Sequence, residues 1–242
     1  ADEDDKIADI METHIISVDT LEDKEIVGHM FRKYDFLALP VVDKDNRLVG
    51  IVTFDDAMDV IQDENTEDFS KMAAIAPNEE SYFRTGIFKH AKSRIVWLLI
   101  LMISATITQI ITNRYEAAFA AVPLLVSFMP MIMDTGGNCG SQSSTLIIRG
   151  IALNEIHFKD TLMVIFKEFR ISLIVSCVLA TANGLRIFLM YHNGLLAIVT
   201  GCSLVFTICI AAMIGCFLPL AAKKIGLDPA LMASPLITTL VD

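Results

Sequence analysis

Residues Met129–Gln142, "MPMIMDTGGNCGSQ", place an aspartate, an asparagine, a glutamine and three glycines inside an otherwise apolar part of the chain. Residues 117–133 carry no charge, and residues 143–148 become apolar again. A carboxylate at the centre of a membrane-crossing helix costs about 2.5–3.5 kcal/mol on insertion scales. Groups with such a cost usually face a water-filled path or a polar partner, so this stretch predicts a functional site within a membrane.

Glycines and prolines add to this prediction. Gly136, Gly137 and Gly140 remove side chains, so that neighbouring backbones can approach closely. Pro123 and Pro130 should kink the helix and free carbonyl groups to line a cavity. The polar side chains that we expect to contact an ion here are Asp134, Asn138 and Gln142. The alternative is a tight helix–helix crossing in which the aspartate caps the second half of a broken helix.

The composition divides the chain into an acidic part and a membrane part. The 242 residues are 54% hydrophobic, more than is usual for a soluble protein. Residues 1–80 hold 22 acidic and 7 basic side chains, whereas residues 81–242 hold 7 acidic and 12 basic ones. This asymmetry predicts an acidic soluble module followed by a membrane module. The net charge of −10 argues against nucleic acid as a partner and favours cations.

Residues 1–68 have the pattern of a small α+β module. A strand is expected at residues 15–18, and a helix follows with Thr20 as its N-cap. Residues 38–43 and 47–53 read as a hairpin around "KDN", and residues 54–64 as an amphipathic helix. A unit of about 55 residues is small for an independent core, so we expect it to pair with a second copy.

Acidic side chains gather on the last helix of this module. Asp55, Asp59 and Asp63 recur at every fourth position and therefore share one helix face. Further acids on or close to this face are Asp56, Glu64, Glu67 and Asp68. Like charges at this spacing repel each other, and Mg²⁺ held through its retained waters would neutralise them. The alternative is a solvated helix face without a ligand.

Residues 94–242 predict an all-α membrane domain of five transmembrane helices, the last of them truncated. The spans are expected at residues 95–112, 119–151, 171–191 and 195–222, with a fifth beginning at 229–230. Residues 69–93 form an acidic linker with an amphipathic connecting helix at 80–92. The chain opens with charged and polar residues where a signal peptide would be apolar.

Basic residues predict the orientation in a cell membrane. They cluster before span one, between spans two and three, and after span four, at Lys89, Lys92, Arg94, Arg149, Lys159, Lys167, Arg170, Lys223 and Lys224. The opposite loops hold only Arg114 and Arg186. The positive-inside rule therefore predicts a multi-pass protein with a cytoplasmic N-terminal module and an exterior C-terminus.

A second polar group lies in "DPALMASPLITTLVD", residues 228–242. Ser234, Thr238 and Asp242 recur at every fourth position, and Thr239 is adjacent. An oxygen-rich stripe with one carboxylate suits a hydrated Mg²⁺, which loses its waters reluctantly. The alternative is hydroxyl bonding back to carbonyls around Pro235, which would leave the aspartate unexplained.

The soluble module resembles a cystathionine-β-synthase (CBS) domain. The matching residues are "DIM" near the start, "LPVVDKDNRLVGIVT", and Thr53 followed three residues later by Asp56. The resemblance implies a module that works in pairs and senses adenine nucleotides or metal ions. It makes Thr53 and Asp56 the candidate residues for ATP.

The two polar groups resemble the MgtE family of magnesium channels. They match as "P-x6-P-x3-D-x-GGN-x-G-x-Q" at 123–142 and "DPA-x4-P-x2-TT-x2-D" at 228–242. The resemblance implies a homodimer in the lipid bilayer, with a pore between protomers that is built around spans two and five. It implies that Asp242 selects Mg²⁺, and that cytoplasmic Mg²⁺ closes the pore. The implied regulatory acids are Asp23, Glu25, Asp35, Asp55, Asp56, Asp59, Glu64, Glu67 and Asp68.

Two other functional classes are open at this level. One is a CBS-regulated transporter of another divalent cation (Co²⁺, Ni²⁺ or Mn²⁺) or of a small solute; a solute site should show uncharged pockets and an inward arginine instead of Asp242. The other is a membrane enzyme. The chain contains neither H-E-x-x-H nor G-x-S-x-G, and its histidines have no ligand spacing, so we expect no enzyme.

Overall fold

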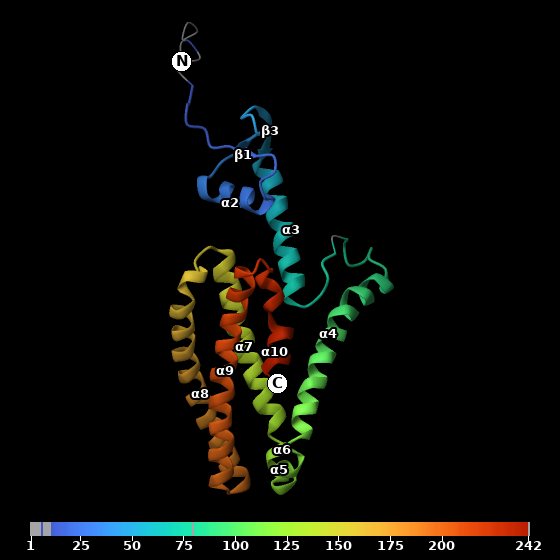
Figure 1. Cartoon of the computed structure of the whole chain (residues 1–242), viewed down its shortest axis with the longest axis vertical. Coiled ribbons are helices and arrows are strands. Elements are labelled where there is room, and N and C mark those ends of the chain that lie inside the picture. Colours follow the sequence, from blue (N-terminus) through green and yellow to red (C-terminus); the bar gives the residue numbers. More distant parts are fainter. Residues whose placement is uncertain (1–5, 7–10, 79, 242) are drawn as a thin grey trace. The chain divides into compact units, whose positions relative to one another are not determined.

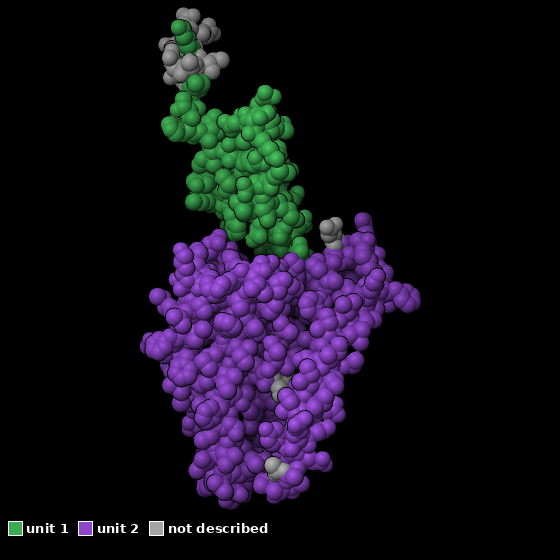
Figure 2. Space-filling model, in the orientation of Figure 1, with its two compact units in different colours: residues 1–67 green, residues 68–242 purple. Residues whose placement is uncertain are grey.

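The computed structural model describes residues 6, 11–78 and 80–241, except for the side chain of Ala118. It divides the chain into two compact units, residues 1–67 and residues 68–242 (Figure 2). Each unit is described separately below.

The first unit has the predicted order β-α-β-β-α (Figure 1). Its elements are β1 (Val18–Asp19), α2 (Lys24–Tyr34), β2 (Ala38–Val42), β3 (Leu48–Thr53) and α3 (Phe54–Met72), the last of which continues into the second unit. The three strands form one sheet in the order β1-β2-β3. β1 pairs with β2 in parallel, and β2 pairs with β3 antiparallel, so the predicted hairpin is confirmed.

The hairpin turn depends on one aspartate and one asparagine. The Asp43 carboxylate accepts hydrogen bonds from the backbone N–H groups of Asp45 at 3.0 Å and Arg47 at 2.8 Å. Asn46 has a φ of 59°, a left-handed conformation that asparagine tolerates better than most residues. The turn chemistry read from "KDN" therefore fixes the register of β2 and β3.

The predicted start of the first helix is wrong. The Thr20 backbone N–H donates to the Val42 carbonyl at 3.1 Å, and this bond extends the sheet beyond β1. α2 instead begins after Asp23, whose carboxylate accepts from the Glu25 N–H at 2.9 Å. β1 is also shorter than the strand expected at residues 15–18.

The core of the first unit is small and its edge strand is open. Phe31 and Leu39 are fully buried, and Val18 and Ala57 pack with them. β3 lies at the edge of the sheet, and Ile51 remains 60% exposed on it. An apolar edge strand of this kind is a surface that natural proteins normally cover.

The second unit is helical. Its helices are α4 (Ile87–Asn113), α5 (Glu116–Ala121), α6 (Pro123–Val126), α7 (Met129–Ala152), α8 (Thr161–Tyr191), α9 (Gly194–Lys224) and α10 (Ser234–Val241), with short 3-10 turns η1 (Phe158–Asp160) and η2 (Pro229–Met232). α9 packs along both α7 and α8, and α10 packs on α7. Both α4 and α9 are long and apolar enough to cross a membrane, whereas the arrangement of five spans stays a prediction.

The connecting helix expected at 80–92 does not form as a separate element. Residues 81–86 form turns, and residues 87–92 are the first turns of α4. Lys89 ion-pairs with Glu80 at 2.9 Å, and this contact lowers the pKa of Glu80. Phe83 and Phe88 are almost fully exposed, which is typical of side chains that rest at a membrane surface.

The second apolar run is broken at its prolines, as the sequence predicts. Pro123 begins α6, and Pro130 lies in the first turn of α7. Proline is tolerated at these positions because its missing N–H would have no helical partner there. The single span expected at 119–151 is therefore α5, α6 and α7 in series.

The glycines of α7 hold the second unit together. A Cβ atom added to Gly140 would lie 2.7 Å from Ile237 Cγ2 of α10 and 2.9 Å from the Ala211 carbonyl oxygen of α9. A Cβ atom added to Gly215 of α9 would overlap the carbonyl oxygen of Gly140. The close backbone approach predicted from the glycines is confirmed, and it brings α9 and α10 onto one face of α7.

Replacing Gly215 by Ala should lower the free energy of unfolding by about 1–3 kcal/mol, the usual cost of overpacking, because backbone atoms of α7 cannot yield like a side chain. Gly194→Ala is the matched control, since Gly194 lies on the same helix with open space at its Cβ position. It should stay within about 0.5 kcal/mol of the parent. Thermal unfolding in detergent measures both; equal midpoints would contradict the packing described here.

Candidate functional site

The polar side chains of the opening stretch lie on one exposed face of α7. Asp134, Asn138 and Gln142 recur at every fourth position, and each is exposed. The Asn138 side-chain amide donates to the Asp134 carboxylate at 3.2 Å. The opposite face is buried and consists of small residues such as Gly136 and Gly140. We call the exposed set, Asp134, Asn138 and Gln142, the α7 stripe.

The α7 stripe has the chemistry of a site for a hydrated cation. It offers one carboxylate and two amide groups, which are hard oxygen ligands of the kind that Mg²⁺ prefers. The alternative role of Asp134 as a helix cap is wrong. α7 begins at Met129, and the carboxylate bonds to a side chain one turn later instead of to backbone N–H groups at a helix start.

Part of the second polar group, residues 228–242, lies next to the α7 stripe. α10 packs on α7, and the Thr238 side chain lies against Gly137, next to Asn138. The hydroxyls of Thr238 and Thr239 donate to the Pro235 carbonyl at 3.1 and 2.8 Å, so the back-bonding alternative is observed. Ser234 is exposed at the start of α10. Asp242, expected one turn after Thr238, lies outside the described residues.

The sequence reading missed a set of hydroxyl groups on α4. Thr239 lines a cavity of about 360 Å³ together with Ser104, Thr108 and Thr112, and the walls also include apolar side chains of both helices. The three α4 residues recur at every fourth position in an otherwise apolar helix. That spacing was visible in the sequence, but hydroxyls in apolar helices commonly bond to their own backbone, as Thr112 does to Thr108.

A buried carboxylate also escaped the sequence reading. Glu168 of α8 is 7% exposed, and it accepts a hydrogen bond from the Ser143 hydroxyl of α7 at 2.7 Å. No lysine or arginine in the described part of the chain forms an ion pair with it. The hydrogen bond from Ser143 satisfies one oxygen of this buried side chain. The signal in the sequence was a glutamate in "FKEFR" at the start of a long apolar helix.

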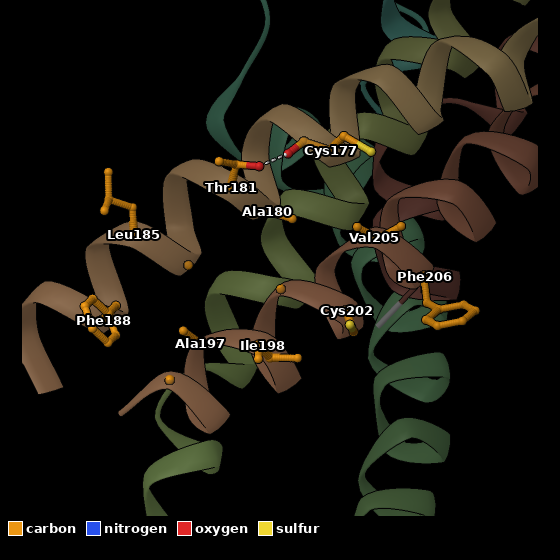
Figure 3. Close-up of a pocket in the computed structure, with 13 residues that line it drawn as sticks. Cys177, Ala180, Thr181, Leu185, Phe188, Ala197, Ile198, Cys202, Val205 and Phe206 are labelled. Carbon is orange, nitrogen blue, oxygen red and sulfur yellow. Dashed lines mark hydrogen bonds between the residues drawn. The ribbon is translucent and has the colours of Figure 1, made fainter. Parts of the chain in front are cut away.

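A separate groove lies between α8 and α9 (Figure 3). Its volume is about 740 Å³, and small residues such as Gly184 and Gly201 open it. Among the described residues that line it, Thr181 has the one oxygen-bearing side chain, and that hydroxyl donates to the Cys177 carbonyl at 2.7 Å (Figure 3). The groove therefore offers no set of ligands for a hard cation.

The candidate regulatory acids occupy exposed or half-buried positions, all of them in the first unit except Asp68, with which the second unit begins. Asp23 and Asp35 cap the two ends of α2, the latter with a left-handed φ of 54°, and Glu25 lies in the first turn. The acids of α3 follow its exposed side, as the sequence predicts for Asp55, Asp59 and Asp63. Within the described residues, no three acidic, histidine or cysteine side chains are grouped closely enough to hold a metal ion.

One of these acids already has a cationic partner. Lys24 of α2 lies 2.8 Å from the Glu64 carboxylate of α3. The bond to Glu64, and the Coulomb attraction that accompanies it, raise the pKa of Lys24. A cation that binds Glu64 would have to displace this lysine.

Thr53 and Asp56 form a capping box at the start of α3. The Asp56 carboxylate accepts hydrogen bonds from the Thr53 hydroxyl at 2.5 Å and from its N–H at 3.3 Å, while the Asp56 N–H donates to the hydroxyl at 3.5 Å. The two bonds from Thr53 lower the pKa of Asp56. The pair expected to contact a nucleotide therefore has a structural role in this helix.

The last turn of α3 is bonded to the segment before α10. Lys71 lies 2.6 Å from the Asp228 carboxylate, and both residues belong to the second unit. The other oxygen of Asp228 accepts from the Ala230 N–H at 2.8 Å, so Asp228 is the N-cap of η2.

Comparisons with known proteins match two parts of the chain. The model of the MgtE family, described as a divalent cation transporter, matches residues 129–242, and a CBS-domain model matches residues 7–63. Residues 129–242 are thus similar to the MgtE family. The matched segment contains the α7 stripe, α10 and the buried Glu168.

Curated relatives carry the same family name. The magnesium transporter MgtE of Bacillus subtilis (strain 168) is 39% identical over 237 residues, which are 98% of this chain and 52% of that protein. The magnesium transporter MgtE of Thermus thermophilus is 38% identical over 239 residues, with the same two shares. The chain thus spans about half the length of these relatives.

One solved structure, titled as the soluble part of a magnesium transporter, is 53% identical to a segment of the chain. It covers 26% of this chain and 25% of that one, with a TM-score of 0.26, so no structural argument rests on it.

Thr53→Val should return the pKa of Asp56 towards its ordinary value, because the hydroxyl donor is lost. In the parent, the lowered pKa contributes stability above the unfolded-state pKa of about 3.9, and this contribution disappears as the pH falls through the folded-state value. The variant should therefore lose less stability on acidification. An NMR titration of the carboxyl group measures the shift. Thr66→Val, which removes a hydroxyl bonded to Gln62 of α3 itself, should leave it unchanged.

Proposed function

We propose that the chain is the regulatory and pore-forming part of a transporter that admits Mg²⁺ across a cell membrane. The observation that carries the proposal is the division of α7 into a buried glycine face and an exposed oxygen-bearing stripe. The family match and the names of the relatives agree with magnesium as the transported ion.

The proposed ion pathway uses oxygen atoms from α7 and α10. Mg²⁺ holds its waters tightly, so a site that passes it needs carboxylate, amide and hydroxyl oxygens that bond to those waters. The residues that we assign to this role are Asp134, Asn138, Gln142, Ser234, Thr238, Thr239 and Asp242. The closeness of Thr238 to the α7 stripe supports one shared pathway.

The pathway is proposed to lie between two copies of the chain. The α7 stripe is exposed in one copy, and polar groups that face lipid would be costly. α4 has no buried residue and contacts α10 only lightly, so a second copy has room to cover both surfaces. The exposed apolar edge of β3 likewise suits a second CBS module.

The proposed orientation follows the basic residues. The first unit lies in the cytoplasm, five helices cross the bilayer, and the C-terminus points to the exterior. The exposed Phe83 and Phe88 would rest among the lipid headgroups on the cytoplasmic side. The same oxygen ligands suit Co²⁺, Ni²⁺ or Mn²⁺, which are the second candidates for transport.

Regulation is assigned to the acids of the first unit. Mg²⁺ bound among Asp23, Glu25, Asp35 and the acids of α3 would relieve their mutual repulsion and favour a closed state. An ion closes the pore only by the amount that its affinity differs between the two states. ATP is assigned to Thr53 and Asp56, where it would have to compete with the hydrogen bond between these two side chains.

Asp242→Asn should reduce Mg²⁺ flux by about tenfold or more, because one carboxylate attracts the hydrated ion more strongly than an amide does. The matched control is Glu155→Gln, which neutralises an exposed acid in the loop after α7. Flux is measured in liposomes that contain a Mg²⁺-sensitive dye. Parental flux in folded Asp242→Asn would contradict the assignment.

Replacing Asp55, Asp59, Glu64 and Glu67 together by their amides should keep conduction but remove inhibition by cytoplasmic Mg²⁺. Lys24→Met should strengthen inhibition by Mg²⁺. It removes the ion pair with Glu64, so a lower Mg²⁺ concentration should suffice for closure. Patch recordings with varied Mg²⁺ on the cytoplasmic side measure both effects. The control is Glu22→Gln with Asp45→Asn, two exposed acids outside the assigned set. Unchanged inhibition in the fourfold variant would exclude this sensor.

A further inference from the structure

We propose that Glu168 is a positioning residue for the ion pathway. Its carboxylate accepts the Ser143 hydroxyl and so fixes the rotation of α7, which decides where the α7 stripe points. This proposal rests on the proposed transport function where ion flux is measured. A second measurement, the labelling of a cysteine placed in the α7 stripe, depends only on how accessible that position is.

The position of the bond in the helix supports this role. Ser143 follows Gln142 directly, and it is 5% exposed whereas Gln142 is exposed. Successive residues of an α-helix point about 100° apart, so anchoring Ser143 towards α8 also fixes the direction of its neighbour. The next residue, Ser144, donates to the Met232 carbonyl of η2 at 2.6 Å. Two adjacent serines thus hold α7 from two sides.

The glycine face and the serine bond hold α7 from different neighbours. Where α7 contacts α9 and α10, the side chains of Thr207 and Ile237 project towards Gly136 and Gly140. The bond to Glu168 adds a directional contact with α8, and a carboxylate is the strongest acceptor available to a serine hydroxyl.

Stability alone does not account for Glu168. An apolar side chain of similar size would fill the same space between the helices without the cost of burying a carboxylate. Within the described residues, the hydrogen bond that this carboxylate accepts is the one from Ser143, and we assign its role to that bond.

The test compares four variants in the full chain: Glu168→Leu, Ser143→Ala, the double variant and Glu168→Gln. The first two should change the ratio of Mg²⁺ to Co²⁺ flux several-fold, a ratio that does not depend on the amount of folded protein. The double variant should equal either single one, since all three lose the same bond. Glu168→Gln keeps an acceptor oxygen and should restore most of the parental ratio. Ser172→Ala is the control, because that buried serine bonds to the Phe169 carbonyl of its own helix.

A second readout needs no transport. Asn138→Cys is introduced after Cys177 and Cys202, the exposed native cysteines, are replaced by Ala. Labelling by a charged, membrane-impermeant thiosulfonate should become several-fold slower when Glu168→Leu is added. If the parent carries no Mg²⁺ flux, the proposed function fails while the labelling rate still decides the role of Glu168. If Glu168→Leu does not fold, Ser143→Ala, which removes a single hydroxyl, takes its place in both assays. An unchanged flux ratio or labelling rate in the folded variants overturns the proposal.

Discussion

The contact between Gly140 of α7 and Gly215 of α9 is the constraint on which the second unit depends. Backbone atoms of one helix occupy the place where a side chain of the other would stand. A helix that packs this closely on α9, and on α10 as well, leaves only its far side for other contacts. The polar residues of α7 lie on that far side.

The same helix therefore meets two opposed demands. Its buried face contains small residues that gain stability from close packing, and its exposed face contains oxygen atoms that are stable only next to water, an ion or a polar partner. Close approach comes from the glycines, and the bond of Ser143 adds a directional contact with α8. In this arrangement, a change in the packing of the buried face of α7 would change the positions of the oxygen ligands on its exposed face.

Local chemistry was predictable from the sequence, and contacts between distant segments were not. The hairpin turn at Asp43 and the helix breaks at Pro123 and Pro130 follow from the conformations that these residues favour. Thr20 does not cap the first helix as expected, because its backbone N–H bonds to Val42 of β2. The sequence pattern of a helix start carries no information about such a bond to a distant strand. The α7 stripe was predictable from spacing, but the burial of Glu168 depends on neighbouring helices far along the chain.

Pro219 of α9 lies one helical turn after Gly215, the residue that contacts Gly140 of α7. Proline has no N–H, so the carbonyl of Gly215, four residues earlier, lacks the hydrogen bond that would close its helical turn. α9 thus lacks one helical hydrogen bond at Gly215, the residue that lies against the backbone of Gly140. Sharp bends of helices are usually found at prolines, so a bend of α9 would fall where the two backbones meet.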